Sequence, residues 1–382
     1  MVLDGLIISI VESENMNDPR IAKLADVLVN YSTSVQPGEW VGILGDVAAL
    51  PLIRAVYEAV VRAGGNPSLF FTDEYMTRQF LRLANDEQLT WLDPSLDLYY
   101  NQADVYIRLG AYPNTRAMSN IDPKIAQKMQ SARRPWLETR MRRASEGKMK
   151  WVGTLYPTEG QAQDAGMSLE EYEDFVFKAC FADKDDPVAE WRKVAEMQEQ
   201  KINWLKGKKS VKLQGPNIDL ELSIEGRTFI NACGERNMPD GEIFTGPVED
   251  SVNGWVKFTY PSIVQGRAVE GIELKFEQGK VVQASAQKHE DLLFAQLDAD
   301  AGSRYLGEFA IGTNFGIDKF TGQILFDEKI GGTVHMAVGL GYPDTGSKNK
   351  SSVHWDMICD MRTDSTIHVD GELFYQNGQF VV

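Results

Sequence analysis

Two stretches near the C-terminus each carry a histidine followed two residues later by an aspartate. They are His354 and Asp356 in SSVHWDMICD, and His368 and Asp370 in STIHVDGE, in a chain of 382 residues with only four histidines. Imidazole and carboxylate groups are common ligands of divalent cations, so each pair is a candidate for part of a metal site. Polar pairs of this kind also occur on ordinary β-strands, and the spacing itself leaves both interpretations open.

The first pair belongs to a stretch whose two faces differ. If residues 353–361 form a strand, residues two apart share a face. One face is then entirely apolar: Val353, Trp355, Met357, Cys359 and Met361. The other face carries His354 and Asp356, whose Cβ atoms would lie about 6.5–7 Å apart, twice the rise per residue. Side chains at that distance can converge on one metal ion or on two adjacent ions.

The second pair is better explained by a turn. Asp370 and Gly371 form the Asp-Gly dipeptide that favours a type I′ hairpin, and an Asn-Gly dipeptide follows at residues 377–378. We therefore expect Asp370 to be a turn residue and His368 to be an exposed strand position. His289 stands at the start of a helix and is expected to be structural or exposed.

Three further residues of metal-binding type lie in largely apolar surroundings. His335 lies in GGTVHMAVGLGY, Glu308 in YLGEFAIG, and Glu242 where the turn NMPDG leads into the strand EIFTG. A charged group in an apolar stretch is costly unless it is paired or bound to a cation. Together with His354 and Asp356, these are the ligand types of a hydrolytic metal pair. The sequence has no H-E-x-x-H and no G-x-S-x-G, so a zincin or a serine hydrolase has no support.

All of these residues fall in the second half of the chain, whose pattern differs from that of the first. Up to about residue 206, helices and strands alternate, which predicts an α/β domain with a largely parallel sheet. From there on, short alternating strands between Gly and Pro turns predict a β-rich, α+β domain. The expected fold class is therefore α/β plus α+β, with an N-terminal domain at 1–207 and a C-terminal, metal-binding catalytic domain at 208–382.

Composition narrows the possible partners and compartments. The formal charge of −16 and pI of about 4.8 argue against nucleic acid and against an anionic membrane surface. Three scattered cysteines fit the reducing cytoplasm. The N-terminus lacks the positive region of a signal peptide, and no apolar run approaches the ~18 residues of a membrane span. GDVAALP at 45–51 and GLGYPDTG at 339–346 lack the sequence or the context of a nucleotide-binding loop.

Four blocks of the second half resemble those of the thermophilic aminopeptidase family, which includes aminopeptidases T and S. The blocks are EGRTFINACGERNMPDGEIFTGPVEDSVNG, RYLGEFAIGTN, GGTVHMAVGLGYP and SSVHWDMICDMR. In the first half, KLADVLVNYSTSVQPGEWVGILGDVAALPLIRAVYEAVVRAGGNP and PTEGQAQDAGMSLEEYEDFVF are similar to the opening and middle of that family. The resemblance covers nearly the whole chain and keeps the order of the motifs.

This resemblance implies a cytoplasmic, homodimeric metallopeptidase that removes N-terminal residues from peptides. The enzyme would use two divalent ions, Zn, Co, Mn or Mg, bound in its second domain. The ligands it implies are Glu242, Glu308, His335, His354 and Asp356. The family's site tyrosine falls on Tyr342. The segment 343–353 is shorter than the family pattern and carries Lys348 and Lys350, which would alter the rim of the cleft.

The resemblance also implies roles. Two ions would turn a bridging water into hydroxide and polarise the scissile carbonyl, with Glu308 between them. Glu242 or Glu308 would accept the proton of the water, and Tyr342 would donate a hydrogen bond to the oxyanion. Arg304 and Arg362 flank the motifs, either as contacts for the carboxylate side of the peptide or as surface charges.

Two other functions stay open at this point. One is a dinuclear hydrolase that acts on another bond, such as a phosphoester or a lactam; the scarcity of basic residues near the ligand blocks counts against phosphate. The other is a non-catalytic α/β ligand-binding protein in which the His and Glu residues belong to the core. For the aminopeptidase itself, attraction of the free α-amine of a peptide to the acidic cleft or to one ion would explain exopeptidase rather than endopeptidase selectivity.

Overall fold

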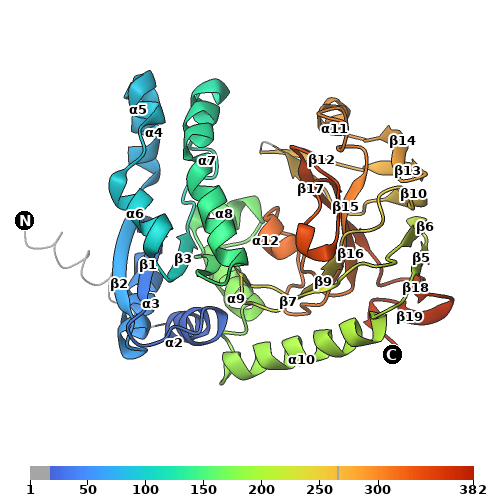
Figure 1. The fold of residues 1–382 in the computed structure, drawn as a ribbon, viewed down its shortest axis with the longest axis horizontal. Helices are drawn as coiled ribbons and strands as arrows, with labels where there is room; N and C mark the ends of the chain where they lie inside the picture. The colour runs from blue at the N-terminus through green and yellow to red at the C-terminus, as the bar shows by residue number, and fades with distance from the viewer. Residues whose placement is uncertain (1–17, 265) are drawn as a thin grey trace, which may run out of the picture. The chain divides into compact units, whose positions relative to one another are not determined.

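The computed structural model describes residues 18–264 and 266–382 (Figure 1). Residues 1–17, for which the sequence predicts no signal peptide, lie outside the described part, as does residue 265. The chain divides into two compact units: one runs up to Glu190 and includes Gly234–Met238, and the other comprises Trp191–Cys233 and Pro239–Val382. The functional domain division at 207/208 stays a prediction. Within residues 18–264 and 266–382, no helix combines the length and the apolar character needed to cross a membrane.

The N-terminal unit is built on a parallel sheet, as predicted. Its strands follow the order β2-β1-β3-β4-β8, and every neighbouring pair is parallel. The strands are β1 (Trp40–Asp46), β2 (Asn66–Thr72), β3 (Val105–Gly110), β4 (Lys150–Leu155) and β8 (Asn237–Met238). The central strands β1 and β3 are buried along most of their length, which explains their nearly continuous apolar sequences.

Helices and turns connect these strands. They are α2 (Pro19–Asp26), a π-helical turn (Val27–Ser32), α3 (Leu50–Arg62), α4 (Glu74–Leu83), α5 (Asp86–Thr90), α6 (Pro94–Gln102), α7 (Pro123–Ser145), α8 (Glu159–Asp164) and α9 (Leu169–Ala179). Helix α9 begins with the capping box that its sequence predicts. The Glu171 N–H donates to Ser168 Oγ, and the Ser168 N–H donates to the Glu171 carboxylate at 2.9 Å.

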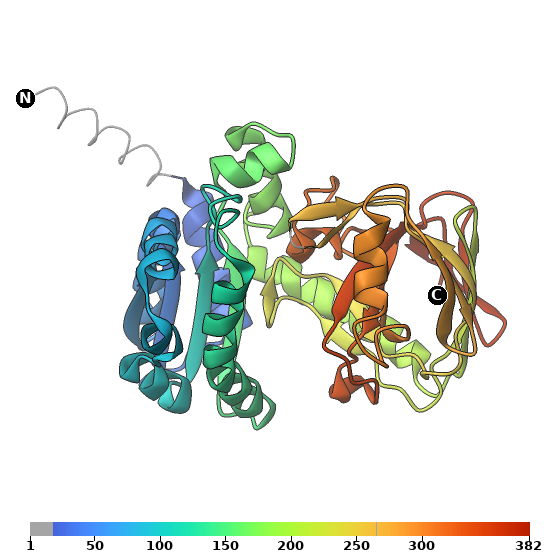
Figure 2. The ribbon, with the colours of Figure 1, turned by 90° about the horizontal axis from the view of Figure 1, so that it is seen from above.

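The C-terminal unit contains two antiparallel sheets, which confirms the β-rich second half (Figure 2). The first, here called the large sheet, has the order β14-β13-β10-β6-β5-β18-β19-β20. Its strands are β5 (Ser210–Gly215), β6 (Ile218–Ser223), β10 (Asn253–Lys257), β13 (Glu273–Glu277), β14 (Lys280–Ser285), β18 (Thr366–Val369), β19 (Glu372–Gln376) and β20 (Gln379–Phe380). The second, here called the site sheet, has the order β17-β16-β15-β9-β7. Its strands are β7 (Ile230–Ala232), β9 (Glu242–Thr245), β15 (Leu306–Gly312), β16 (Thr333–Gly339) and β17 (His354–Asp360).

Shorter elements complete this unit. Strands β11 (Ser262–Val264) and β12 (Arg267–Val269) form a separate antiparallel pair. The helices are α10 (Pro187–Leu205), which belongs to this unit from Trp191 onward, α11 (Glu290–Leu297) and α12 (Ile324–Asp327). The sequence predicts α10 and α11, whereas the four-residue α12 is too short to produce a periodic pattern.

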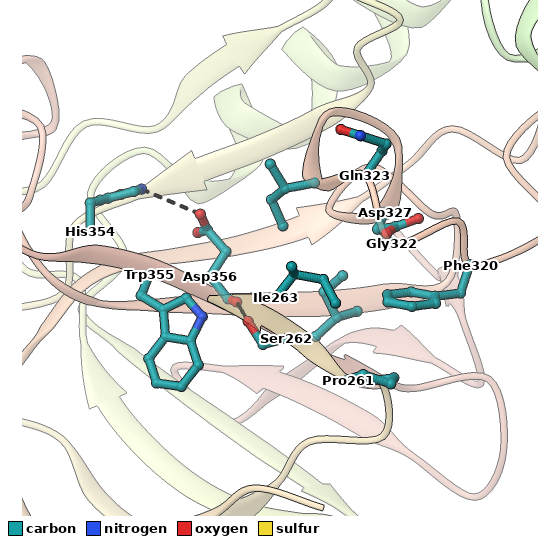
Figure 3. Close-up of a pocket in the computed structure, with 12 residues that line it drawn as sticks. Pro261, Ser262, Ile263, Phe320, Gly322, Gln323, Asp327, His354, Trp355 and Asp356 are labelled. Atoms are coloured by element: carbon teal, nitrogen blue, oxygen red, sulfur yellow. Dashed lines mark hydrogen bonds and ion pairs between the residues drawn. The ribbon is translucent and has the colours of Figure 1, made fainter. Parts of the chain in front are cut away.

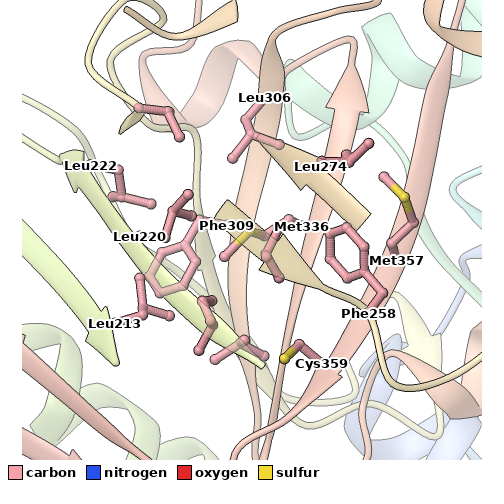
Figure 4. Packing of buried hydrophobic residues seen from close by; sticks show 14 of the residues in the cluster. Leu213, Leu220, Leu222, Phe258, Leu274, Leu306, Phe309, Met336, Met357 and Cys359 are labelled. Carbon is pink, nitrogen blue, oxygen red and sulfur yellow. The ribbon is translucent and has the colours of Figure 1, made fainter. Parts of the chain in front are cut away.

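A shared apolar core joins the two sheets of the C-terminal unit. Leu213 and Leu220 from the large sheet belong to the same buried cluster as Phe309, Met336 and Met357 from the site sheet (Figure 4). Side chains alternate between the two faces of a strand. Because each site-sheet strand gives every second side chain to this core, the residues between them lie on the opposite face of the sheet.

The two predicted hairpin turns are present. Asp370 and Gly371 have φ of 50° and 82°, and residues 377–378 have φ of 49° and 82°, the positive values that a type I′ turn requires. The Asp370 carboxylate also accepts the backbone N–H of Ser210 at 2.8 Å. His368 is half-buried on β18, rather than exposed as the sequence predicts. This hairpin therefore uses Asp370 for structure.

Candidate metal centre

One face of the site sheet collects the acidic and histidine residues that the sequence singles out. Alternation sends Phe309, Met336 and Met357 into the core, so their neighbours lie on the opposite face. The residues on that face are Glu242 on β9, Glu308 on β15, His335 on β16, and His354 and Asp356 on β17. Glu308 lies opposite Ala337, and Ala337 lies opposite Asp356 in the register. The small alanine side chain leaves space between the two carboxylates.

A bulge in β15 sets the direction of Glu308. The register with β16 shifts between Leu306 and Glu308, so Gly307 is the extra residue. A Cβ atom at Gly307 would lie 2.3 Å from the Leu340 carbonyl oxygen and 2.5 Å from that of Gly339. The Leu340 oxygen is also the hydrogen-bond acceptor of His354 Nδ1, at 2.8 Å. The close approach of Gly307 to the Leu340 carbonyl therefore affects the positions of both Glu308 and His354.

Gly307→Ala is expected to weaken metal binding because the new methyl group displaces Glu308 and the Leu340 carbonyl. Overpacking of this kind typically costs about 1–3 kcal/mol of stability. We expect a lower melting temperature and at least about a tenfold lower metal affinity, measured by competition with a chromogenic chelator. Gly153→Ala on β4 is the matched control, since a Cβ atom there meets nothing within 4 Å. An affinity equal to that of the parent protein would contradict the role of the bulge.

The first group of site residues consists of Glu242, Glu308 and His335, all buried. His335 Nε2 lies 3.2 Å from Glu242 Oε2 and 3.3 Å from Glu308 Oε1. Burial raises the pKa of Glu242 to about 8, although Lys329 and His335 act in the opposite direction. Burial opposes protonation of His335, but Glu242 and Glu308 outweigh it and raise the pKa of this imidazole to about 9. In this group, two buried carboxylates lie against one imidazole, which is an electrostatically unfavourable arrangement.

The second group consists of Glu308, His354 and Asp356. His354 Nε2 lies 3.6 Å from Glu308 Oε2 and 3.6 Å from Asp356 Oδ2 (Figure 3 shows the His354–Asp356 contact). The Nδ1–H of His354 donates to the Leu340 carbonyl, which leaves Nε2 as the atom available to bind an ion. Burial raises the pKa of Asp356 to about 6, against the effect of His354.

Glu308 is common to both groups and offers one oxygen to each histidine. Within each group the ligand atoms lie within 4.8 Å of one another. Asp356 Oδ1 is buried with no hydrogen-bond partner among the described residues, and buried Glu242 Oε2 has only its ion-pair contact with His335 Nε2 at 3.2 Å. Buried polar atoms in that state are destabilising unless another partner binds them. The arrangement therefore fits two neighbouring cations that share a carboxylate.

Three residues of this cluster, Asp240, Glu328 and Lys329, are not among the site residues predicted from the sequence. Lys329 is 1% exposed, and its Nζ lies 2.5 Å from Glu242 Oε1, 2.6 Å from Glu328 Oε1 and 3.7 Å from Asp240 Oδ1. Glu328 also forms a candidate ligand group with His335 and Asp356. Burial opposes ionisation of both side chains, but Lys329 lowers the pKa of Glu328, and the acids raise that of Lys329. The sequence shows few basic residues near the ligand blocks, and the structure brings one, Lys329, into the cluster with its charge engaged by carboxylates.

The formal charges of the cluster also match two divalent ions. Its carboxylates are Asp240, Glu242, Glu308, Glu328 and Asp356. In the protonation state that binds metal, with every acid ionised and both imidazoles neutral, five carboxylates and the Lys329 ammonium leave a formal charge of −4, which two divalent cations would balance. An uncompensated charge of this size is costly in a buried site.

Tyr342 lies at the edge of the cluster. Its ring packs edge-on against His354, with centroids 5.2 Å apart, and against Phe244 at 5.7 Å. The residue is 41% exposed, yet burial of its phenol and the nearby Glu308 raise its pKa. The hydroxyl is therefore protonated at neutral pH and can donate a hydrogen bond.

The other residues named from the sequence have partners elsewhere. Arg304 binds Asp298 at 2.7 Å, and Arg362 binds Asp360 and the Tyr260 hydroxyl. His289 Nδ1 contacts the Ala268 carbonyl at 2.9 Å and stands at the start of α11. Lys348 and Lys350 are exposed, on the segment between Tyr342 and β17. None of these five side chains belongs to the candidate ligand groups found in the described residues.

The fold and the cluster define a two-unit protein with an acid-rich, histidine-containing candidate metal centre on one antiparallel sheet. Residues 17–380 match the model of the thermophilic metalloprotease family M29, and the chain belongs to that family. The predicted family is thus confirmed.

Individual relatives agree with this membership. Aminopeptidase 2 of Geobacillus stearothermophilus is 28% identical over 93% of this chain and 92% of its own length. The structure of wild-type AmpT from Thermus thermophilus, at 23% identity, superposes with a TM-score of 0.82 and covers 95% of this chain and 99% of its own. A 2,5-dihydroxypyridine dioxygenase from Pseudomonas putida KT2440 shares the fold more distantly, with a TM-score of 0.55 at 15% identity over 95% of this chain and 97% of its own. Fold similarity therefore does not define the reaction.

Proposed function

We propose that this protein is an aminopeptidase that binds two divalent ions and uses them to release N-terminal amino acids from peptides. The observation that carries the proposal is the position of Glu308, whose two oxygens face two different histidines. Glu242 and His335 would complete one ion site, and His354 and Asp356 the other. The curated relatives named as aminopeptidases match this chain over almost its full length, which supports the same peptide chemistry here.

Ions bound there would acidify a water molecule and polarise the scissile carbonyl. The chain's own residues would do the rest. Glu308 would hold the two halves of the site together, and Glu242 and Glu308 are the proposed proton acceptors. Tyr342, protonated and packed against His354, would donate a hydrogen bond to the developing oxyanion. The negative surroundings would attract the free α-amine of a peptide and so favour its N-terminal residue.

Removal of divalent ions is expected to abolish hydrolysis of aminoacyl-p-nitroanilides. The cations among the described side chains of the cluster, Lys329 and a protonated His335, are engaged by its carboxylates and do not supply the Lewis acid that two metal ions would. Activity should return when Co²⁺, Zn²⁺, Mn²⁺ or Mg²⁺ is added after EDTA, and ion content measured by mass spectrometry should approach two per chain.

The same assay separates the alternative functions. N-acetylated substrates should not be cleaved, because they lack the free amine. Activity restricted to blocked substrates or to a phosphoester would indicate a hydrolase of another bond. Full activity in EDTA would contradict metal dependence, and binding of ligands without any hydrolysis would favour the non-catalytic alternative.

We also propose that the chain forms a homodimer through an apolar face of the N-terminal unit. In this unit, large apolar side chains are exposed on β2, α4 and the segment after α5: Phe71, Tyr75, Met76, Leu83 and Trp91. Met76 is 70% exposed and Leu83 is 80% exposed, and an apolar group of this size is typical of a protein interface. Light scattering should give twice the chain mass of 42.8 kDa for the parent protein. The double variant Met76→Glu and Leu83→Glu should give the mass of a single chain. A monomeric parent protein would contradict the proposal.

A cytoplasmic location stays part of this proposal. All three cysteines are buried as small apolar residues, which suits a reducing compartment. Fractionation of the source cells would test it, and recovery from an exported fraction would contradict it.

A further inference from the structure

A hollow of about 340 Å³ opens beside the second group of site residues (Figure 3). His354 and Asp356 form one side of it. The opposite side is built from two segments that the sequence does not link to the site, the β11 segment with Ile263 and the α12 segment with Phe320 and Ile324. The hollow therefore borders the candidate ion site directly, yet it contains residues that take no part in ion binding.

The walls of this hollow are mainly apolar and exposed to whatever enters it. Ile263 is 42% exposed and Ile324 is 47% exposed, whereas Trp355 and Ile358 behind them are buried. Phe320 is held in place by a stacked contact with Tyr260, with ring centroids 5.4 Å apart and planes at 20°. Exposed isoleucines on a supported wall gain free energy when an apolar group covers them.

Two polar side chains of the hollow already have partners, whereas Asp356 Oδ1 and Trp355 Nε1 have no hydrogen-bond partner among the described residues. Ser262 Oγ donates to the Asp356 carbonyl at 2.6 Å. Asp327 Oδ1 accepts the backbone N–H of Thr321 at 2.7 Å and its hydroxyl at 2.9 Å. Neither lysine nor arginine is among the described residues that line the hollow. An acidic side chain would therefore meet Asp327 and Asp356 here without a compensating cation.

We propose that this hollow binds the side chain of the N-terminal residue of the substrate and selects large apolar residues, such as leucine, methionine and phenylalanine. The inference rests on the proposed aminopeptidase function. The α-amine and the side chain of a residue branch from the same Cα atom. An amine held by the acidic cluster therefore brings the side chain within one residue's reach of Asp356, and thus into the hollow.

The size of the hollow agrees with a single side chain. Sites for small molecules span about 300–1,000 Å³, so 340 Å³ lies at the lower end and leaves no room for several residues. Selectivity of this kind comes from differences in buried apolar area between substrates. One methylene group in an apolar pocket is worth about 10–200-fold in kcat/KM.

Two substrate series test which residue enters the hollow. In the first series the N-terminal residue varies among Gly, Ala, Leu, Met, Phe, Glu and Arg, and aminomethylcoumarin is the constant leaving group. In the second series Leu is constant and the following residue varies in dipeptide amides. We expect kcat/KM in the first series to rise at least about tenfold from Ala to Leu, with Glu the poorest, and we expect the second series to be nearly flat.

Variants of the exposed isoleucines test the location. Ile324→Ala and Ile263→Ala should each lower kcat/KM about tenfold for Leu and Phe substrates but less than about twofold for the Ala substrate. Ile324→Trp should reverse the order and favour Ala, because the indole fills the hollow. Val282→Ala on β14 is the matched control, since Val282 is 43% exposed and is not among the residues that line the hollow. This substitution should leave kcat/KM unchanged for both the Leu and the Ala substrate.

The outcomes distinguish this inference from the function on which it rests. If the protein cleaves no aminoacyl substrate with any of the added ions, the result would contradict the proposed function itself. The pocket assignment would be overturned, and the aminopeptidase function kept, if kcat/KM of an active enzyme did not depend on the N-terminal residue of the substrate. The same holds if kcat/KM depended on the second residue, or were highest for N-terminal Arg. Equal effects of Ile324→Ala on Leu and Ala substrates would also overturn it. Melting temperatures close to that of the parent protein would show that the variants are folded.

Discussion

His354→Ala is expected to lower kcat/KM for aminoacyl-p-nitroanilides by about a thousandfold or more. His354 Nε2 faces Glu308 and Asp356, and no other described imidazole belongs to this group. Loss of a residue that only supports a ligand typically costs about 10–100-fold, so direct loss of a ligand should cost more. The bound ion content, measured by mass spectrometry after dialysis, should fall from two per chain to about one.

His368→Ala is the matched control, since it removes the same imidazole from a similar His-x-Asp sequence. His368 lies on β18 in the large sheet, and the Asp370 carboxylate two residues later is occupied by backbone N–H groups. We expect kcat/KM within about twofold of the parent protein and an unchanged ion content. Similar losses in the two variants would show that the strand-face argument does not distinguish a site from a hairpin.

Alternation along the strands explains why so much of the site could be predicted. The face of β17 that carries His354 and Asp356 is recognisable because every second residue from Val353 to Met361 is apolar, and all of these are buried in the core. Glu308 and His335 are visible for the same reason, as single polar residues within apolar strands. A period of two assigns each of these side chains to a face. The assembly of the four strands that carry the predicted ligands into one sheet needs pairings that a single strand's pattern does not contain.

Other features of the fold have weak sequence signals. Helix α7 carries Pro135 in its interior and few buried residues, so it lacks the amphipathic period of a predictable helix. Strand β8 has only two residues, and it returns to the N-terminal unit from within the second half. The bulge at Gly307 depends on carbonyl groups at residues 339–340, far along the chain. Each of these features is decided by packing against distant segments.

Glu328 and Lys329 were missed for a related reason. An acid next to a base, shortly before a strand, is usually a pair of solvated surface charges. Their burial results from the backbone of the α12 segment, where the Asn314 N–H donates to the Lys329 carbonyl at 3.0 Å and the Gly331 N–H donates to the Asn314 carbonyl at 3.0 Å. These non-local bonds turn the lysine inward, and no local pattern reports them.

Lys329→Met is expected to destabilise the metal-free protein strongly and the metal-loaded protein much less. Methionine keeps most of the side-chain volume but leaves Glu242 and Glu328 without their shared cation. Removing one partner of a buried ion pair typically costs about 3–5 kcal/mol. Bound divalent ions neutralise the same carboxylates, so they should recover a large part of that loss. Melting curves in EDTA and in excess Zn²⁺ or Co²⁺ would measure both states.

Lys212→Met provides the control, because Lys212 is exposed on β5 and its substitution should leave both melting curves nearly unchanged. The informative quantity is the difference between the two conditions, since an ordinary packing defect would lower the melting temperature equally with and without ions. A Lys329→Met protein that melts like its parent in EDTA would show that the acidic cluster does not need this ammonium. A deficit that persists in saturating ions would mean that Lys329 supports the fold rather than the charge of the metal centre.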